Sequence, residues 1–490
     1  MLDKDRKRHE NDAQNMDTYT MKNSGTAEHS DSVFLTLGVD IGTTTVSAVV
    51  LDAAAGIQRD AFTVPHDAAV PGTAPWDRRQ DVRTIMRIVR ELTDTALARY
   101  PDIRAVGFTG QMHGILYLGA DGAPLSDLYT WQDGRAGISE EDGVSLCERL
   151  EAETGYRLSP GYGLATHGWN VRHGLVPEGA RRLCTIMDYA AAALCGTSPV
   201  CHPSNAASLG FFDADAMCFD TEALRRAGIE PELLPEVAGD DRVVGTYRGI
   251  PVVTAIGDNQ AGVFGTLGDR PGGVLANFGT GSQISVIRTK DSVRGFQPVR
   301  EIELRPFLSD RVLVCGSALC GGRAYAVMER FFRAYQTACG YPEEEQYEVM
   351  NRLALSGIER MQSSPENVLR VCTAFCGTRA DPALRGEIAN ISEDNFTPEN
   401  LVAGTLYGMA EELFSLYRKM PESEITAFAA SGNAVRKNEA LRRVLCTVFG
   451  REVKIPVQRE EAAYGAAMFA LRAAYSAEAE RYLHDCIRYL

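Results

Sequence analysis

Two segments far apart in this chain share one pattern: a β-rich run, a turn containing Gly-Thr, and a second β-rich run. The first covers residues 34–51 and the second covers residues 274–287. When the two Gly-Thr turns are aligned, Asn277 falls opposite Asp40. Two β-rich runs joined by a tight turn predict a hairpin. We therefore expect two lobes with one ground plan, with chance similarity of short turns as the alternative.

A second feature is also repeated. An apolar run at 105–108 enters Thr-Gly-Gln, and an apolar run at 427–430 enters Ser-Gly-Asn in the same way. Between the first hairpin and the first of these runs, residues 81–100 carry apolar side chains at helical spacing. Helical and β segments alternate in both halves, which predicts an α/β fold of two lobes.

The length of 490 residues favours more than one domain. An apolar run at 252–256 ends at Gly257-Asp258, where we place the domain boundary. A late segment, 460–467, is rich in small residues and is expected to be a packing helix. The expected organisation is a disordered tail at 1–31, an N-terminal domain at 32–257, a C-terminal domain at 258–475 and a C-terminal extension at 476–490.

The charge balance argues against some partners. Asp and Glu exceed Lys and Arg, giving a formal net charge of -15. Such a charge disfavours binding to nucleic acid or to an anionic membrane. The chain has no run approaching the roughly 20 apolar residues of a membrane span and no apolar stretch typical of a signal peptide. We therefore expect a cytoplasmic protein.

Twelve cysteines are scattered along the chain. The nearest neighbours, Cys315 with Cys320 and Cys372 with Cys376, do not have the CxxC spacing typical of zinc or redox sites. We expect reduced thiols that are mostly buried.

The two Gly-Thr turns suit a polyphosphate, which needs convergent N–H donors and no bulky side chain. No Walker A pattern and no G-x-G-x-x-G after a strand occurs, so the common phosphate loops are excluded. Plain hairpins are the alternative for each turn alone. The residues expected to hold the nucleotide phosphates are Gly42, Thr43, Thr44, Gly279, Thr280 and Gly281.

Two carboxylates are candidates for the chemistry. Asp40 precedes the first turn, and Mg²⁺ bound to ATP typically takes one or two carboxylates together with phosphates and water. Asp258 follows an apolar strand at the presumed lobe boundary, where a carboxylate could accept a proton from an attacking hydroxyl. The alternatives are a turn-capping role for Asp40 and a helix N-cap for Asp258.

A polyol site combines hydrogen-bonding groups with an apolar wall. The segment after the strand at 105–108, and a second segment about twenty residues later, supply both kinds of side chain. The candidates are Gln111, Met112, His113, Trp131, Asp133 and Arg135. A structural histidine and a surface Asp133–Arg135 pair are the alternatives.

From 33 to 474 the chain resembles the FGGY carbohydrate kinases, which share the actin and hexokinase type of ATPase fold, related to ribonuclease H. The matching motifs are Asp40-Ile41-Gly42-Thr43-Thr44, Gly257-Asp258-Asn259-Gln260-Ala261, Asn277-Phe278-Gly279-Thr280-Gly281-Ser282 and Ser431-Gly432-Asn433-Ala434 with Lys437-Asn438-Glu439. The sequence departs from the family at 429–432, where many members carry three glycines. The resemblance implies a cleft between the lobes, Asp258 as general base, Asp40 beside Mg²⁺, and Gly432, Asn433 and Asn438 near the ATP base.

Within that family, Gln111-Met112-His113-Gly114 is shared by xylulokinases and sedoheptulokinases, whereas 130–135, 154–156, 188–196 and 204–208 look more like sedoheptulokinases. The resemblance thus implies ATP-dependent phosphorylation of the terminal hydroxyl of a ketose, with sedoheptulose expected first. D-xylulose or another ketose or polyol is the alternative substrate, and a non-catalytic actin-like ATP-binding protein is the alternative class. The sequence leaves the oligomeric state open, a homodimer included.

Overall fold

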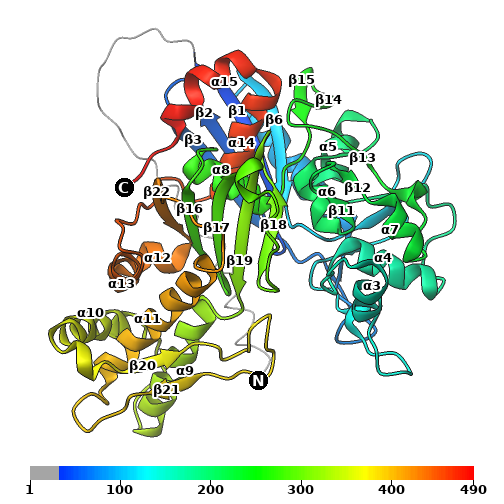
Figure 1. The fold of residues 1–490 in the computed structure, drawn as a ribbon. Coiled ribbons are helices and arrows are strands. Elements are labelled where there is room, and N and C mark those ends of the chain that lie inside the picture. The colour runs from blue at the N-terminus through cyan, green and yellow to red at the C-terminus, as the bar shows by residue number, and fades with distance from the viewer. Residues whose placement is uncertain (1–32) are drawn as a thin grey trace, which may run out of the picture. The chain divides into compact units, whose positions relative to one another are not determined.

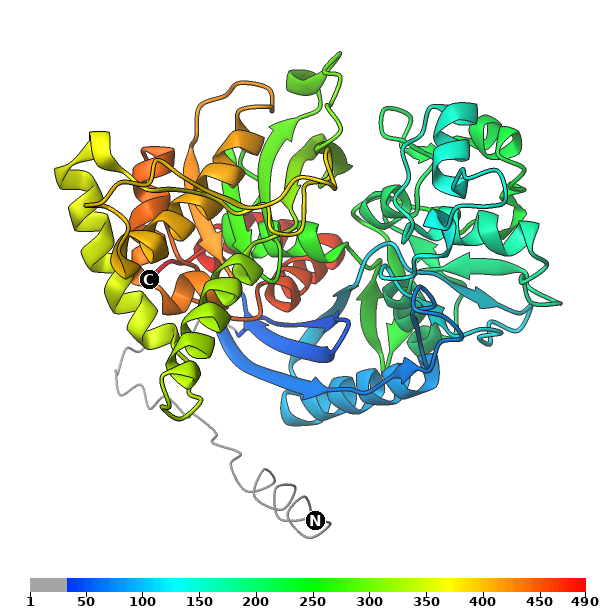
Figure 2. The same ribbon diagram turned by 90° about the horizontal axis from the view of Figure 1, so that it is seen from below.

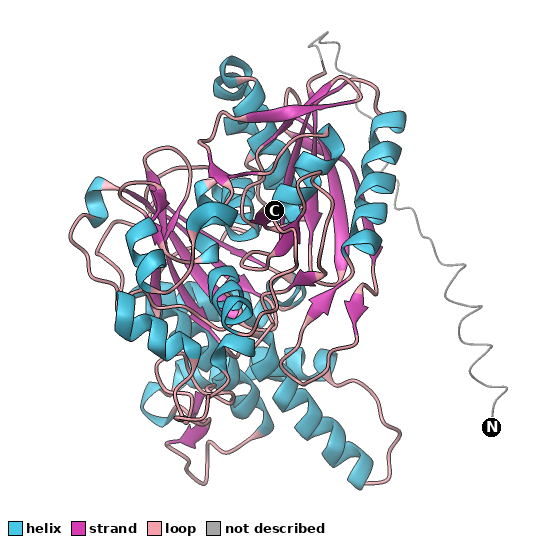
Figure 3. Cartoon of the chain, turned by 90° about the vertical axis from the view of Figure 1, so that its right-hand side faces the viewer, coloured by secondary structure: helices cyan, strands magenta, loops and turns pink. Residues whose placement is uncertain are grey.

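A computed structural model describes residues 33–490, so the predicted disordered tail at 1–31 lies outside the described residues. Within the described part, strands form two main sheets that are flanked by helices (Figure 3). Figure 1 labels these elements in chain order.

The first sheet has the strand order β14-β15-β6-β1-β2-β3. Alternating apolar and β-branched residues form its central strands, which are almost fully buried. Strands β1 and β2 are antiparallel, and β1 and β6 are parallel. Its strands are β1 (Leu35–Ile41), β2 (Thr45–Asp52), β3 (Ile57–Pro65), β6 (Ile103–Gly110), β14 (Val243–Tyr247) and β15 (Ile250–Val253).

The second sheet has the order β18-β19-β17-β16-β22. Its strands are β16 (Gly273–Phe278), β17 (Ser282–Thr289), β18 (Ile302–Pro306), β19 (Arg311–Ala318) and β22 (Ala427–Ser431). Here β16 pairs antiparallel with β17 and parallel with β22, as β1 does with β2 and β6. Asp40 pairs with Thr109, and Asn277 pairs with Ser431. The predicted repeat is therefore confirmed in both topology and register.

Helices of the first half are α2 (Val82–Arg99), α3 (Leu146–Thr154), α4 (Gly163–Arg172), α5 (Ile186–Cys195), α6 (Pro203–Leu209) and α7 (Thr221–Arg226). Those of the second half are α8 (Asp258–Leu267), α9 (Gly322–Ala338), α10 (Tyr347–Ser363), α11 (Pro398–Tyr417), α12 (Asn433–Lys437), α13 (Glu439–Phe449), α14 (Glu461–Ala474) and α15 (Ser476–Tyr482). In Figure 2 the yellow-green to orange helices α9 to α13 gather beside the second sheet, away from the teal to green helices α3 to α7. The predicted helix at 81–100 is confirmed as α2, with Asp81 as its N-cap.

Short strands complete the fold. They are β4 (Ala69–Val70), β5 (Arg79–Gln80), β7 (Leu116–Leu118), β8 (Leu128–Tyr129), β9 (Arg182–Cys184), β10 (Val200–Cys201), β11 (Phe212–Asp213), β12 (Cys218–Phe219), β13 (Glu236–Val237), β20 (Arg370–Cys372) and β21 (Glu387–Ala389).

Helices α8 and α14 connect the two halves of the fold. The hydroxyl of Thr36 on β1 donates to the carbonyl of Ala467 on α14, with a distance of 2.8 Å. A Cβ atom at Gly465 would lie 1.8 Å from the carbonyl oxygen of Ala261 on α8, so only glycine allows this approach of the two helices. The packing role predicted for the small residues at 460–467 is confirmed. The C-terminal extension returns to the first sheet, where Arg488 donates to the carbonyl of Ala55.

No helix within residues 33–490 has the length and apolar character needed to cross a membrane.

Candidate active site

Three hydrogen bonds to backbone carbonyls fix the first Gly-Thr turn. The Gly42 N–H donates to the carbonyl of Thr45 at 2.9 Å, which closes the turn between β1 and β2. The Gln80 amide donates to the carbonyl of Thr43 at 2.7 Å, and a ring nitrogen of His66 lies 3.1 Å from the carbonyl of Gly42. Because these carbonyls are occupied, the turn is fixed while its outer face stays accessible at Thr44.

The second turn rests on the start of α9. The N–H groups of Gly322 and Arg323 donate to the carbonyls of Gly279 and Thr280 at 2.8 and 3.1 Å. The positive end of a long helix therefore lies beside the turn, where it favours an anion. The sequence interpretation missed this contribution, although the glycine pair before an apolar-periodic segment was a visible signal.

Gly432 packs directly against the second Gly-Thr turn. Its φ is 98°, and a Cβ atom there would lie 2.3 Å from the carbonyl oxygen of Phe278. This confirms that a glycine is needed at this position for close approach. Asn433, the first residue of α12, is exposed beside it.

Asn438, predicted to border the ATP base, is mostly buried and has protein partners. Its side-chain oxygen accepts from the N–H of Leu441 at 3.0 Å and so caps α13. A helix cap is the geometric role of this residue, and contact with a base stays a prediction.

The two candidate carboxylates lie close enough to repel each other. Burial, then the charge of Asp258, then that of Glu460 raise the pKa of Asp40 to about 7. Burial also raises the pKa of Asp258 to about 6. Two partly buried carboxylates with raised pKa values form an acidic pair that a cation would stabilise.

Asp258 begins α8 but is not its cap. Gly257 is the N-cap, so the N-cap interpretation of Asp258 is wrong. One carboxylate oxygen of Asp258 accepts from the N–H of Asn259 at 2.6 Å. The preceding N–H, of Gly257, donates to the Ser204 hydroxyl at 3.0 Å. The backbone on both sides of Asp258 is therefore fixed by hydrogen bonds.

The polyol-binding candidates after β6 lie next to these carboxylates. The Gln111 N–H donates to the carbonyl of Ile41, the residue after Asp40, at 2.9 Å. Met112 is buried, and a Cβ atom at Gly257 would lie 2.8 Å from its sulfur atom. The side-chain oxygen of Gln111 is buried and has no hydrogen-bond partner among the described residues.

His113 is held in one orientation and one tautomer. Its φ of 74° is strained for a side chain of this size. Its Nδ1 atom lies 2.8 Å from the carbonyl of Ser208, which can only accept, so Nδ1 carries the proton. Burial, assisted by Arg305, lowers the pKa of His113 to about 4, so the ring is neutral and Nε2 is an acceptor. The ring stacks on Tyr162 with centroids 4.6 Å apart.

Trp131, from the second candidate segment, contacts the first Gly-Thr turn. Its indole N–H donates to the Thr43 hydroxyl at 3.0 Å, and the side chain is 47% exposed.

Asp133 and Arg135 differ from Trp131 because both are buried, so the surface-pair interpretation is wrong. Arg135 donates to Asp133 at 2.7 and 3.0 Å and to Asn170 at 2.7 Å. The N–H of Arg78 also donates to Asp133. This pair shapes the loop that carries Trp131, and direct contact with a sugar stays a prediction.

A charged cluster from the second lobe faces His113 and was missed by the sequence interpretation. Arg305 and Glu303 on β18 pair at 2.7 Å, and Arg379 lies 3.7 Å from Glu303. Arg305 also donates to the side-chain oxygen of Asn259 at 3.2 Å. Although burial acts in the opposite direction, the two guanidinium groups lower the pKa of Glu303 to about 2. Alternating charges on a short strand resemble a solvent face, so sequence alone gave no signal.

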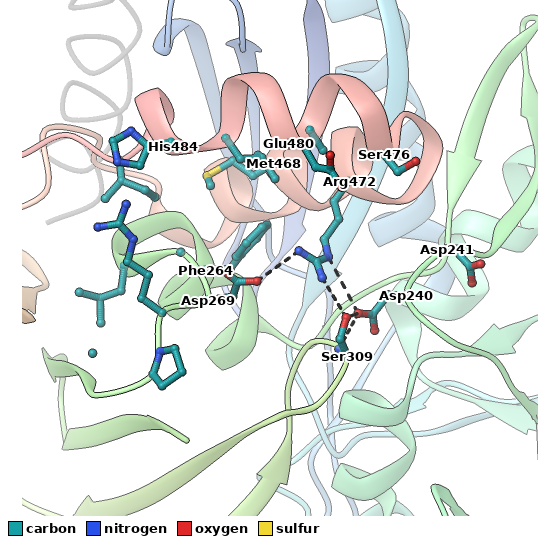
Figure 4. Close-up of a pocket in the computed structure, with 18 of the residues that line it drawn as sticks. Asp240, Asp241, Phe264, Asp269, Ser309, Met468, Arg472, Ser476, Glu480 and His484 are labelled. Carbon is teal, nitrogen blue, oxygen red and sulfur yellow. Dashed lines mark hydrogen bonds and ion pairs between the residues drawn. The ribbon is translucent and has the colours of Figure 1, made fainter. Parts of the chain in front are cut away.

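A cavity of about 1100 Å³ lies elsewhere, at the C-terminal end of α8 (Figure 4). Its wall includes Arg472, which donates to the Ser309 hydroxyl at 2.9 Å and pairs with Asp269 at 3.3 Å. Since Asp258 begins the same helix, this cavity is separate from the carboxylate pair.

Among residues 33–490, no group of three or more His, Cys, Asp or Glu side chains could hold a metal ion unaided. The acidic pair could contribute one or two ligands, which suits Mg²⁺ brought by phosphates but not a protein-only metal cage.

Comparison with known proteins agrees with this geometry. Residues 35–265 match the N-terminal domain of the FGGY family of carbohydrate kinases, and residues 274–474 match its C-terminal domain. The sedoheptulokinase of Mus musculus is 28% identical, covering 89% of this chain and 97% of its own length. A xylulose kinase of Streptomyces rubiginosus is 27% identical over 54% of this chain and 58% of its own. The solved xylulose kinase of Rhodospirillum rubrum has a TM-score of 0.77 at 21% identity and covers 93% of both chains. The predicted two-lobed α/β kinase fold is thereby confirmed.

Proposed function

Because this chain belongs to the FGGY family of carbohydrate kinases, we propose that it transfers the γ-phosphoryl group of ATP to the terminal hydroxyl of a ketose, sedoheptulose first. The single observation that carries the proposal is the position of Asp258, which lies near Asp40 of the first phosphate turn. On this proposal, a base and a phosphate-side carboxylate would share one site.

Asp258 would accept the proton of the attacking hydroxyl. With a pKa raised to about 6, its carboxylate is ionised at neutral pH yet more basic than an ordinary aspartate. One carboxylate oxygen accepts from the N–H of Asn259, and the other oxygen would take the proton. Phosphoryl transfer then relies on positioning and on neutralisation of phosphate charge.

The phosphates would lie between the two Gly-Thr turns. Backbone N–H groups of 43–44 and 279–281, with the hydroxyls of Thr43, Thr44 and Thr280, would supply the donors, and the positive end of α9 would add to the field. Gly432, Asn433 and Asn438 would border the base of ATP.

The acidic pair fits Mg²⁺. Asp40, whose pKa is raised by burial and by neighbouring carboxylates, would hold the ion on the phosphate side. When bound, Mg²⁺ would neutralise phosphate charge and remove the repulsion between Asp40 and Asp258.

The sugar would bind over Met112 and His113. The neutral Nε2 atom of His113 would accept from one hydroxyl, and the unpaired side-chain oxygen of Gln111 would accept from another. Trp131 would supply an apolar wall, as sugar C–H groups require. Asp133 and Arg135 would act by holding Trp131.

The choice of sedoheptulose rests on the sequence stretches named above and on the likeness to sedoheptulokinases over most of the chain. D-xylulose is the runner-up, since xylulose kinases match about half of the chain. Arg305 beside His113 also makes a sugar acid worth testing, because a cation there would favour a carboxylate.

The test is a kinase assay with Mg-ATP across sedoheptulose, D-xylulose, glycerol and D-gluconate, with the product position assigned by NMR. The proposal predicts a 7-phosphate of sedoheptulose and the highest kcat/KM for that sugar. A preference for D-gluconate would indicate that Arg305 selects a sugar acid. Absence of turnover with every ketose would refute the proposal.

A further inference from the structure

A chain of hydrogen bonds runs through buried side chains to the residue before Asp258. The Gly257 N–H donates to the Ser204 hydroxyl at 3.0 Å, and the Ser204 oxygen lies 2.8 Å from Nδ1 of His202. Nε2 of His202 lies 2.9 Å from a carboxylate oxygen of Asp240. His202 and Ser204 are almost fully buried, so these contacts are shielded from bulk water.

Each group in this chain has a defined role as donor or acceptor. Nδ1 of His202 accepts from the Ser204 N–H at 3.2 Å, so this nitrogen carries no proton and also accepts from the Ser204 hydroxyl. Nε2 therefore carries the ring proton and donates to Asp240. Although burial acts in the opposite direction, the hydrogen bond from His202 lowers the pKa of Asp240, whose carboxylate is ionised at neutral pH. The chain thus ends in a charge-assisted hydrogen bond.

Asp240 connects this chain to the second half of the fold. Its other carboxylate oxygen accepts from the Ser309 N–H at 2.7 Å and from the Ser309 hydroxyl at 3.1 Å. Ser309 lies between β18 and β19, and its hydroxyl accepts from Arg472 on α14 at 2.9 Å (Figure 4). The chain therefore reaches from the start of α8 to the wall of the 1100 Å³ cavity.

The backbone before Asp258 has little room to move. Asn205, also on α6, donates its side-chain N–H to the carbonyl of Ala255 at 2.9 Å. A Cβ atom at Gly257 would lie 2.6 Å from the side-chain oxygen of Gln260. Gly257 is the N-cap of α8 and Asp258 is its first residue, so a displacement of Gly257 would also move Asp258.

We propose that His202 and Ser204 are positioning residues, which hold the start of α8 so that Asp258 stays in place for the attacking hydroxyl, and that Asp240 ties this hold to the second half of the fold. The inference rests on the proposed function of Asp258. A misplacement of about 1 Å at a reacting group can slow a reaction about 10²-fold. Loss of the chain should therefore slow phosphoryl transfer without weakening binding.

The test uses two variants of the full chain. Ser204→Ala removes the acceptor of the Gly257 N–H. His202→Asn keeps a side-chain oxygen that can cap α6 but is too short to reach Asp240. Because Ser204→Ala removes only one oxygen atom, it tests the proposal even if His202→Asn does not fold.

Ser145→Ala is the matched control, because the Ser145 hydroxyl also accepts from a backbone N–H, that of Glu148, at the start of α3. Ser204→Ala is also combined with Asp258→Asn. Hydrogen–deuterium exchange follows the amides of 257–260. The single-turnover rate is expressed per nucleotide site, counted with ADP by calorimetry, so that unfolded protein does not lower it.

We expect Ser204→Ala to speed exchange at 257–260 and to lower the single-turnover rate at least about fivefold, with KM for Mg-ATP and for sugar within about twofold of wild type. His202→Asn should lower the rate at least about threefold. Adding Ser204→Ala to Asp258→Asn should lower the residual rate no further. Ser145→Ala should match wild type in exchange at 257–260 and in rate.

Unchanged exchange in Ser204→Ala, or an equal fractional loss of rate with and without Asp258→Asn, would overturn the positioning role. A wild-type rate in His202→Asn would overturn the tie through Asp240. A nearly unchanged rate in Asp258→Asn alone would instead refute the proposed base. A slow Asp258→Asn with a fully active Ser204→Ala would overturn only the positioning role.

Discussion

The indole N–H of Trp131 donates to the hydroxyl of Thr43 at 3.0 Å, which ties the segment proposed to hold the sugar to the first Gly-Thr turn, where the phosphates are proposed to bind. This hydrogen bond would therefore connect the proposed sugar site with the proposed nucleotide site. Trp131→Phe keeps an aromatic wall and removes the donor. We expect kcat/KM to fall by roughly two- to tenfold, as for loss of one hydrogen bond of about 0.5–1.5 kcal/mol.

The control for that prediction is a double-mutant cycle with Thr43→Val. If the hydrogen bond carries the effect, the double variant should lose no more activity than either single variant. Additive losses would show that the two side chains act separately.

The pH dependence of kcat/KM should reflect the ionisation of Asp258. A base must be ionised, so kcat/KM should rise with pH through about 6, where burial places the pKa of Asp258, and level off above it. The charge of Arg305 acts against burial and lowers this pKa. Arg305→Met should therefore move the acid limb to higher pH, which a merely structural role would not do.

Arg294→Met is the matched control for Arg305, because Arg294 is 83% exposed and, within residues 33–490, forms its salt bridge with nearby Asp291. Its pH profile should match that of wild type. If the acid limb of the pH profile is not shifted in Arg305→Met, the charge of Arg305 does not affect the pKa of Asp258.

Asp40→Ala should mainly affect the nucleotide. If Asp40 holds Mg²⁺ beside the phosphates, KM for Mg-ATP should rise at least about tenfold, while sugar affinity changes little. The measurement is sugar binding by calorimetry without nucleotide, together with steady-state kinetics. Asp67→Ala, an exposed carboxylate of the same lobe, is the control. Equal losses of sugar and nucleotide affinity in Asp40→Ala would indicate a structural turn residue.

Sedoheptulose should be preferred to D-xylulose. A site that pairs the two extra hydroxyls of the seven-carbon sugar leaves polar groups unpaired with the shorter one, at about 1–3 kcal/mol each. The unpaired, buried side-chain oxygen of Gln111 is one such group. Gln111→Leu should narrow the ratio of the two kcat/KM values, and an unchanged ratio would exclude Gln111 from the choice of sugar.

Much of the framework could be predicted from local patterns. β-rich runs around a Gly-Thr turn predict a hairpin, and β1 with β2 and β16 with β17 form as expected. The strands begin or end within one or two residues of the predicted limits because a turn needs only the residues that reverse the chain.

The site was only partly predictable, since its remaining contacts join distant segments. Arg305 and Tyr162 reach His113 from different lobes, and nothing in their local sequence indicates a shared target. Asn438 was different, because an Asn before Glu and an apolar-periodic run is a recognisable helix cap. Burial of Asp133 with Arg135 depends on tertiary packing around Asn170 and was not visible in the chain.

The measurement that tests the central claim most directly is the single-turnover rate of phosphoryl transfer in Asp258→Asn, alongside affinity for sugar and ADP and stability to urea. We predict a rate lowered by about 10²-fold or more with both affinities near wild type. Stability should not fall, because burial raises the pKa of Asp258 and so disfavours its ionised form in the folded state. A rate close to that of wild type would contradict the role of Asp258 as the base.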